Sequence, residues 1–215
     1  EKKIYPIENY GSAMAPFYST LAIWVGAVVM AAMLKVTVAD STKKKLFHSK
    51  EYQLYIGRIL LLIIIGFMQS ALICLGDLFF LGIQCKHPVM FVLTGMFTSF
   101  VYVNLIYALT VSFGDIGKAI AVVLMVMQVA GSGGTFPIQC APKFFQVVYP
   151  LLPFTHSMNA MRECIAGFYG TTYAAEIGKL AIYLVPSLLL GLLLRKPIIK
   201  MNEAFMEKLE STHLI

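Results

Sequence analysis

Residues 59–83 read ILLLIIIGFMQSALICLGDLFFLGI, an apolar stretch of 25 residues in which Asp77 is the one charged side chain. A helix rises about 1.5 Å per residue and needs roughly 20 apolar residues to cross about 30 Å of hydrocarbon, so this stretch is long enough to span a membrane. The whole chain agrees, with 59% hydrophobic residues, 13% charged residues and a mean hydropathy of +0.77. Soluble domains carry roughly 25% charged residues. The sequence therefore predicts a polytopic membrane protein.

The predicted fold is all-α with five transmembrane helices in this chain. The expected spans are residues 17–34, 59–83, 89–113, 119–134 and 180–194, and Pro186 is expected to kink the last of them. Residues 1–16 are predicted to form an extracytoplasmic juxtamembrane segment, residues 17–199 the transmembrane domain, and residues 200–215 a cytoplasmic tail. The chain begins with Glu1 rather than Met, which favours an upstream part that is not included here.

Lysine and arginine residues predict the orientation. With five spans, eleven of the 17 fall in one set of loops and six in the other. The positive-inside rule then places the 35–58 loop and the C-terminus in the cytoplasm and the N-terminal end outside. The net charge of +6 is explained by these topology-setting residues beside anionic lipid. Because the sequence has neither a base-stacking motif nor a continuous basic stripe, we expect no nucleic-acid partner.

The 144–161 stretch has no formal charge and resembles a sixth span in hydropathy. Two internal prolines, Pro150 and Pro153, and the polar group between Thr155 and Asn159 argue against a straight crossing. Irregular backbone at membrane depth is tolerated only when it packs against protein or water. We therefore predict that residues 135–170 form an outer re-entrant hairpin of short helices, broken at Pro150–Pro153, that caps the bundle.

The 35–58 loop contains a lysine run that follows a potential helix cap at residues 40–42. Leu46, Phe47, Tyr52 and Tyr55 would give such a helix an apolar side. One interpretation is a coupling helix pressed against a cytoplasmic partner, and the other is an interfacial helix on lipid headgroups. The spacing of the apolar residues does not distinguish between these two interpretations. The residues assigned to partner contact are Lys43, Lys44, Lys45, Phe47, Glu51 and Tyr52.

The sequence offers no catalytic chemistry. Residues 114–119 (GDIGKA) lack the spacing and the Ser or Thr of a phosphate loop, and instead predict a tight cytoplasmic turn. The four histidines show no paired helical spacing for a metal, and no Ser/His/Asp or Cys/His set can be assembled. We therefore expect no enzyme activity, metal or cofactor in this chain, and any ATP must be hydrolysed by a separate subunit.

A few polar residues lie in or near the spans. Asp77 is placed near the outer interface, which favours a polar contact there over a proton or substrate site. Asn104 lies deeper and is expected to bond between helices, for about 1 kcal/mol. Arg162 and Glu163 are expected to anchor the outer helices rather than to bind substrate. Each needs a different partner, because adjacent helical positions do not face each other.

Three cysteines fall on the predicted outer side, namely Cys85, Cys140 and Cys164. A disulfide among them is chemically allowed in an oxidising exterior. The sequence leaves the pairing open, and one of the three would stay unpaired.

Several motifs resemble a known family. The stretches NYGSAMAPF (9–17), QVAGSGGTFP (128–137), PKFFQ (142–146), YPLLPFT (149–155) and NAMRE (159–163) resemble the C-terminal membrane domain of the YhgE/Pip (phage infection protein) family. That family is similar to the ABC-2-type permeases of bacterial plasma membranes. The resemblance assigns to the outer hairpin the residues Gly133, Gly134, Phe136, Pro137, Pro150, Pro153, Asn159, Arg162 and Glu163.

The resemblance implies a permease of six spans, of which the first, with a large extracytoplasmic region, would lie upstream of Glu1. It implies a homodimer or heterodimer in the lipid bilayer, driven by a separate ATP-binding subunit, that exports an unidentified substrate. The alternative is a membrane anchor or receptor for phage or a secretion assembly. A third hypothesis, an ion-coupled transporter, would require a proton dependence that is lost in Asp77→Asn.

Overall fold

A computed structural model describes residues 7, 9–34 and 51–194 of the chain. Within these ranges all regular structure is helical, as the sequence predicts. The long helices are α1 (Tyr10–Met33), α3 (Glu51–Phe79), α4 (Pro88–Phe113) and α5 (Asp115–Gly131). Shorter elements follow: η1 (Ile138–Cys140), α6 (Lys143–Val148), η2 (Tyr149–Leu151), α7 (Pro153–Ala166), α8 (Thr172–Ile182), α9 (Leu184–Leu188) and the π-helical η3 (Leu189–Leu194).

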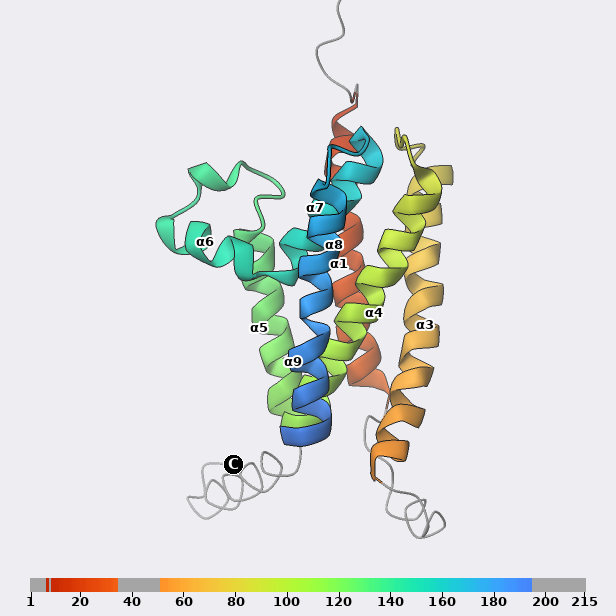
Figure 1. The fold of residues 1–215 in the computed structure, drawn as a ribbon, viewed down its shortest axis with the longest axis vertical. Coiled ribbons are helices and arrows are strands. Elements are labelled where there is room, and N and C mark those ends of the chain that lie inside the picture. Colours follow the sequence, from red (N-terminus) through yellow and green to blue (C-terminus); the bar gives the residue numbers. More distant parts are fainter. Residues whose placement is uncertain (1–6, 8, 35–50, 195–215) are drawn as a thin grey trace, which may run out of the picture.

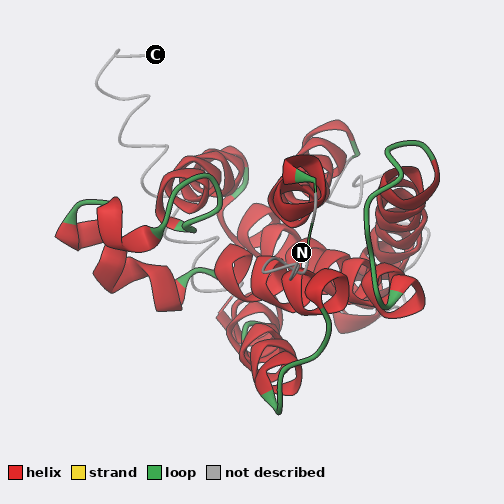
Figure 2. Ribbon diagram, turned by 90° about the horizontal axis from the view of Figure 1, so that it is seen from above, coloured by secondary structure: helices red, strands yellow, loops and turns green. Residues whose placement is uncertain are grey.

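The long helices run side by side along one axis and alternate in direction (Figure 1). Helix α1 begins at the upper end, α3 returns to it, α4 descends, α5 rises, and the α8–α9–η3 pass descends again. The α6 region projects from one side of the bundle, which the view along the axis also shows (Figure 2). The described part of the chain therefore starts and finishes at opposite ends of the bundle.

Four helical segments are long and apolar enough to cross a membrane by length and composition: Tyr10–Met33, Tyr55–Phe79, Pro88–Phe113 and Thr172–Leu192. The other expected span corresponds to α5, which has 17 residues. At 1.5 Å per residue α5 is about 26 Å long, somewhat less than the roughly 30 Å of a hydrocarbon core. Length and composition therefore support four of the five expected crossings.

Helix α4 lies at the centre of the core. It contacts α1, α3, α5, α7 and α9, and a larger share of it is buried than of the other long helices. Tyr102 of α4 packs edge-on against Trp24 of α1, with ring centroids 4.7 Å apart, and both side chains are fully buried. The Trp24 Nε1–H donates to the carbonyl oxygen of Ala121 in α5 at 3.2 Å. One aromatic pair thus connects three of the long helices.

The connection between α4 and α5 is the tight turn predicted from the glycine pair. Gly114 is the one residue between the two helices, and its φ of 62° favours glycine. Gly117 lies where α5 passes the end of α4. A Cβ there would be 2.6 Å from the carbonyl carbon of Leu109 and closer still to its oxygen. Both glycines are therefore required by the backbone path.

The last helical pass is interrupted where the sequence predicts a kink. Pro186 has no N–H to donate to Ile182, four residues earlier, and its ring crowds that carbonyl. Helix α8 ends at Ile182 and α9 begins at Leu184. Below the break, Ser112 of α4 donates a hydrogen bond to the Leu190 carbonyl oxygen at 3.2 Å, which holds the lower part of this pass against the core.

Tyr55 differs from its expected role. The sequence places it on the apolar side of a separate short helix, but α3 is continuous from Glu51 and carries Tyr55 into the core. Its ring packs on Tyr107 with centroids 4.9 Å apart, and it fills the space beside Gly191. Tertiary packing therefore extends the span helix into the predicted loop.

Candidate functional site

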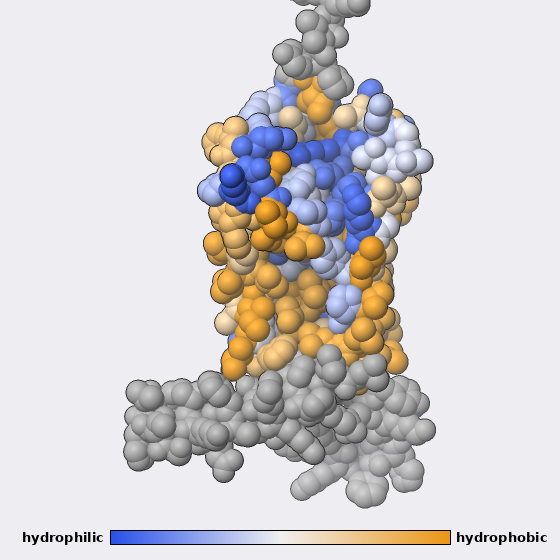
Figure 3. All heavy atoms as spheres, turned by 60° about the vertical axis from the view of Figure 1, so that its left-hand side comes forward, coloured by the Kyte–Doolittle hydropathy of each residue, from blue (hydrophilic) through white to orange (hydrophobic). Residues whose placement is uncertain are grey.

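Helix α7 carries three consecutive buried polar side chains, Thr155, His156 and Ser157. This helix starts at Pro153, which suits a first helical position because proline lacks an N–H, and it ends before Gly167, whose φ is 108°. Helix α6 and the 3-10 turn η2 precede it, so short helices meet at Pro150–Pro153. Polar residues cover the upper part of the face in Figure 3, whereas apolar residues cover most of the face below them.

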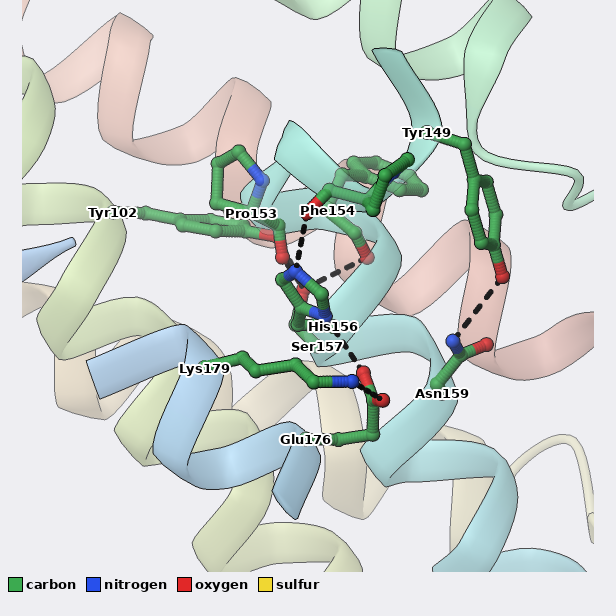
Figure 4. A network of polar contacts seen from close by, with 10 residues as sticks. Tyr102, Tyr149, Pro153, Phe154, His156, Ser157, Asn159, Glu176 and Lys179 are labelled. Atoms are coloured by element: carbon green, nitrogen blue, oxygen red, sulfur yellow. Dashed lines mark hydrogen bonds and ion pairs between the residues drawn. The ribbon is translucent and has the colours of Figure 1, made fainter. Parts of the chain in front are cut away.

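A buried charged network joins α7 to α8 (Figure 4). The His156 Nδ1 lies 2.7 Å from the Glu176 Oε2, and the His156 Nε2 lies 3.0 Å from the Pro150 carbonyl oxygen. The Lys179 ammonium donates to the other Glu176 oxygen at 2.8 Å. The His156 and Glu176 side chains are only 6% and 10% exposed, whereas Lys179 is 52% exposed. The network thus fixes α7, the Pro150 break and the start of the last helical pass in one arrangement.

Two further contacts hold the start of α7 against the core. The Ser157 and Tyr102 hydroxyls are hydrogen-bonded in a fully buried position. The Phe154 backbone N–H, one of the unpaired donors at a helix start, donates to the Gln128 side-chain oxygen in α5 at 3.2 Å. Both Gln128 and Ser157 are almost inaccessible. Helix α7 is therefore positioned by α4, α5 and α8 together.

Arg162 and Glu163 have separate partners, as adjacent helical positions require. The Arg162 guanidinium donates to the carbonyl oxygens of Gly133 and Gly134, each at 3.4 Å. Glu163 accepts a hydrogen bond from the Tyr169 backbone N–H at 2.7 Å, just beyond the end of α7. Both contacts are to backbone groups of the connecting segments, so the pair anchors loops on either side of α7.

The remaining residues of the predicted hairpin do not share one site, and each has its own surroundings. The Asn159 amide donates to the Tyr149 hydroxyl at 3.2 Å and thereby connects α7 to η2. Gly134 lies under the Phe17 ring, where a Cβ would be 2.7 Å from a ring carbon. Phe136 is exposed and, with Pro137, lines a small open cavity of about 170 Å³ beside the end of α5.

Asp77 and Asn104 do not come together with these groups. Asp77 accepts a hydrogen bond from Ser19 of α1 near the upper end of α3, which is the polar contact that the sequence favours. Asn104 differs from expectation, because its amide donates to the Phe100 carbonyl oxygen at 2.7 Å, within α4 itself. A short polar side chain can satisfy itself on the preceding turn of its own helix, so this bond does not join two helices.

The cysteines are free thiols in this structure. Cys140 is exposed on η1, whereas Cys85 and Cys164 lie close to each other at another part of the upper end. Cys74 is buried within α3.

Of the residues assigned to partner contact, Lys43, Lys44, Lys45 and Phe47 lie outside the described residues. Glu51 and Tyr52 belong to the first turn of α3, at the lower end of the bundle in Figure 1. That end also carries the Gly114 turn.

The sequence did not reveal His156, Glu176, Gln128 or Tyr102 as members of one cluster. The signals available were the polar run around His156 and the Glu176–Lys179 spacing of three, which places both on one helix face. Neither signal shows that they meet. Among the described residues, no three His, Cys, Asp or Glu side chains could hold a metal ion. The cluster can position helices against one another.

Comparison with known proteins gives the chain a family. Residues 2–194 match the family described as ABC-2 family transporter protein. The chain is also 26% identical over 163 residues to a curated protein of Bacillus subtilis (strain 168) named "Uncharacterized protein YhgE". That match covers 76% of this chain and 20% of YhgE, so the chain spans about a fifth of this relative's length. No solved structure shows a significant match. The resemblance seen in the sequence motifs is confirmed, and the chain belongs to the ABC-2 transporter family of membrane proteins.

Proposed function

We propose that this chain is a permease subunit that crosses the membrane five times and translocates a substrate, with energy from a separate ATP-hydrolysing subunit. The observation that carries the proposal is the family match over residues 2–194, which include the whole described bundle. The proposal includes a second permease chain, identical or different, which rests on family membership alone.

The alternating helices support the five crossings. Helix α5 runs between the two ends of the bundle like its neighbours, and it exposes Val122, Val123 and Val126 on its outer side, which suits contact with lipid. A hydrocarbon core can thin locally around a helix of about 26 Å at a modest energetic cost. The distribution of lysine and arginine then places the lower end of the bundle, which carries the Gly114 turn, on the cytoplasmic side of a plasma membrane.

The contacts of α7 support an outer cap. In the proposed orientation residues 135–170 lie at the outer end, with α7 held by buried bonds and the α6 region projecting beside the bundle. Helix α6 exposes Phe144 and Val147 while it begins with the exposed cation Lys143, a composition suited to the interface between lipid tails and headgroups. This segment is the proposed re-entrant hairpin, and it would close the outer end of a translocation path.

Coupling to an ATPase is proposed for residues 35–58, which follow α1 in the sequence and include the first two turns of α3. Reversing their charge in a Lys43→Glu, Lys44→Glu, Lys45→Glu variant is expected to lower the stimulation of a co-purified ATPase. The stimulation of ATP hydrolysis is expected to fall about tenfold or more. Placing like charges opposite each other across an interface costs several kcal/mol, and about 1.4 kcal/mol corresponds to a factor of ten in binding. The measurement is ATP hydrolysis by the complex in proteoliposomes.

The matched control is Lys143→Glu, which reverses an exposed lysine at the other end of the bundle and should leave ATP hydrolysis unchanged. Two results would count against coupling through this loop: an unchanged rate in the triple variant, or no ATP-hydrolysing subunit in the purified complex. The second result, combined with an intact cellular phenotype, would favour the membrane anchor or receptor instead.

A further inference from the structure

Cys85 and Cys164 come from distant parts of the sequence and meet at the upper end of the bundle. Cys85 lies in the segment between α3 and α4, and Cys164 lies in the last turn of α7. The Cys85 thiol donates to the carbonyl oxygen of Cys164 at 3.4 Å. Cys85 is partly accessible, whereas Cys164 is fully buried. The pair therefore combines a thiol that a reagent can reach with a second thiol behind it.

The backbone keeps the two cysteines in register. The N–H groups of Lys86 and His87, which follow Cys85, donate to the carbonyl oxygens of Ile165 and Cys164 at 3.2 and 3.0 Å. The His87 ring also stacks on Phe168, with centroids 4.3 Å apart and planes 7° from parallel. Hydrogen bonds thus join the two backbones at neighbouring residues and keep Cys85 and Cys164 close together.

We propose that Cys85 and Cys164 form a disulfide when the protein meets a disulfide oxidant, and that this bond ties the α3–α4 segment to the end of α7. The proposal concerns a modification site and does not depend on the proposed transport function. In the proposed orientation the site faces the exterior, where disulfides persist.

The reaction balances as two thiol–disulfide exchanges. The Cys85 thiolate attacks one sulfur of the oxidant RSSR, forms a mixed disulfide and releases RS⁻. The Cys164 thiolate then attacks the Cys85 sulfur, forms the Cys85–Cys164 bond and releases the second RS⁻. Two protein thiols lose two electrons, the oxidant is reduced to two RSH, and the two protein protons end on these products.

The reaction should be slow at neutral pH and faster in mild alkali. Burial raises the pKa of the Cys85 thiol, and burial together with neighbouring negative charge raises the pKa of Cys164 to about 11. The thiolate is the nucleophile, and below the pKa its fraction rises about tenfold per pH unit. Formation of the disulfide should therefore accelerate by about tenfold between pH 7 and pH 8.

The two other cysteines are poorly placed for the same reaction. Cys74 is fully buried within α3, so an oxidant cannot reach its thiol for a first exchange, although Cys164 and Cys85 lie within electrostatic range of it. Cys140 is exposed on η1, where it lines the cavity at the end of α5, away from the Cys85–Cys164 contact. These two positions serve as internal references.

The test is oxidation of the intact protein in detergent with oxidised glutathione at pH 7 and pH 8, followed by alkylation, digestion and mass spectrometry. The expected product is a peptide pair joined through Cys85 and Cys164, formed faster at pH 8, with two protein thiols lost. Dithiothreitol should restore both. Cys140→Ser should leave this cross-link intact, and Cys85→Ser should abolish it. A protein that keeps Cys85 and Cys164 as thiols or stable glutathione adducts, or that links Cys74 or Cys140 instead, would overturn the proposal.

Discussion

Replacing Gly117 by alanine is expected to destabilise the protein strongly, although the change adds a single methyl group. The new Cβ would lie 2.6 Å from the Leu109 carbonyl carbon and 3.0 Å from the Thr110 nitrogen, so it meets backbone that cannot rotate away. Overpacking of this kind costs about 3 kcal/mol, which corresponds to a fall of roughly 6 to 12 °C in Tm for a chain of this size. The measurement is thermal unfolding in detergent, followed by circular dichroism or tryptophan fluorescence.

The matched control is Gly178→Ala in α8. A Cβ at Gly178 has nothing within 4 Å, and alanine favours a helix over glycine by roughly 0.5–1 kcal/mol, so Tm should stay the same or rise slightly. If the Gly117→Ala and Gly178→Ala variants unfold at the same temperature, the result would contradict the close contact between α5 and the end of α4.

Loss of the His156 side chain is expected to be similarly damaging. His156→Ala leaves the buried Glu176 carboxylate with only its partly exposed Lys179 partner and leaves the Pro150 carbonyl oxygen without its donor. Leaving a buried acceptor without its hydrogen-bond donor costs about 1–3 kcal/mol, and more when the acceptor is charged, so the expected loss is about 3 kcal/mol. A double-mutant cycle with Glu176→Gln should give a coupling energy of about 1–3 kcal/mol, because the two side chains share one network.

The Lys118→Ala variant is the control for His156→Ala, because it removes one partner of an exposed ion pair. The Lys118 ammonium lies 2.8 Å from the Asp115 carboxylate, about as close as the atoms of the buried pair, but Asp115 is 95% exposed. Water screens such a pair, so the variant should unfold at the temperature of the parent protein. Equal losses for Lys118→Ala and His156→Ala would show that burial of the α7–α8 network contributes nothing.

The fold class and the approximate helices could be predicted from the sequence, because lipid restricts a long apolar segment to a helix. The helix limits were harder. Helix α3 begins at Glu51, inside the predicted loop, because Tyr55 packs against Tyr107 and Gly191. Helix α1 begins at Tyr10 rather than near Phe17, through a small polar segment whose Ser12 is buried. Hydropathy reports composition and does not show which polar residues tertiary packing will cover.

The candidate site was predictable only in part. The prolines at 150 and 153 marked where the outer helices would break, and adjacency alone required separate partners for Arg162 and Glu163. The meeting of His156 with Glu176 could not be predicted, because the two belong to different helices and their relative rotation depends on the whole bundle. The Asn104 bond also depends on rotamer choice, which the sequence does not specify.

The central claim is that the chain crosses the membrane five times and that the outer segment and the Gly114 turn lie on opposite sides. Cysteine labelling in intact cells tests this claim most directly. In a background with the four native cysteines replaced by serine, Tyr169→Cys and Asp115→Cys each provide one exposed thiol, beyond α7 and at the α4–α5 turn. A membrane-impermeant maleimide should label Tyr169→Cys in intact cells and Asp115→Cys only after permeabilisation. Labelling of both positions in intact cells, or of Asp115→Cys alone, would contradict the account.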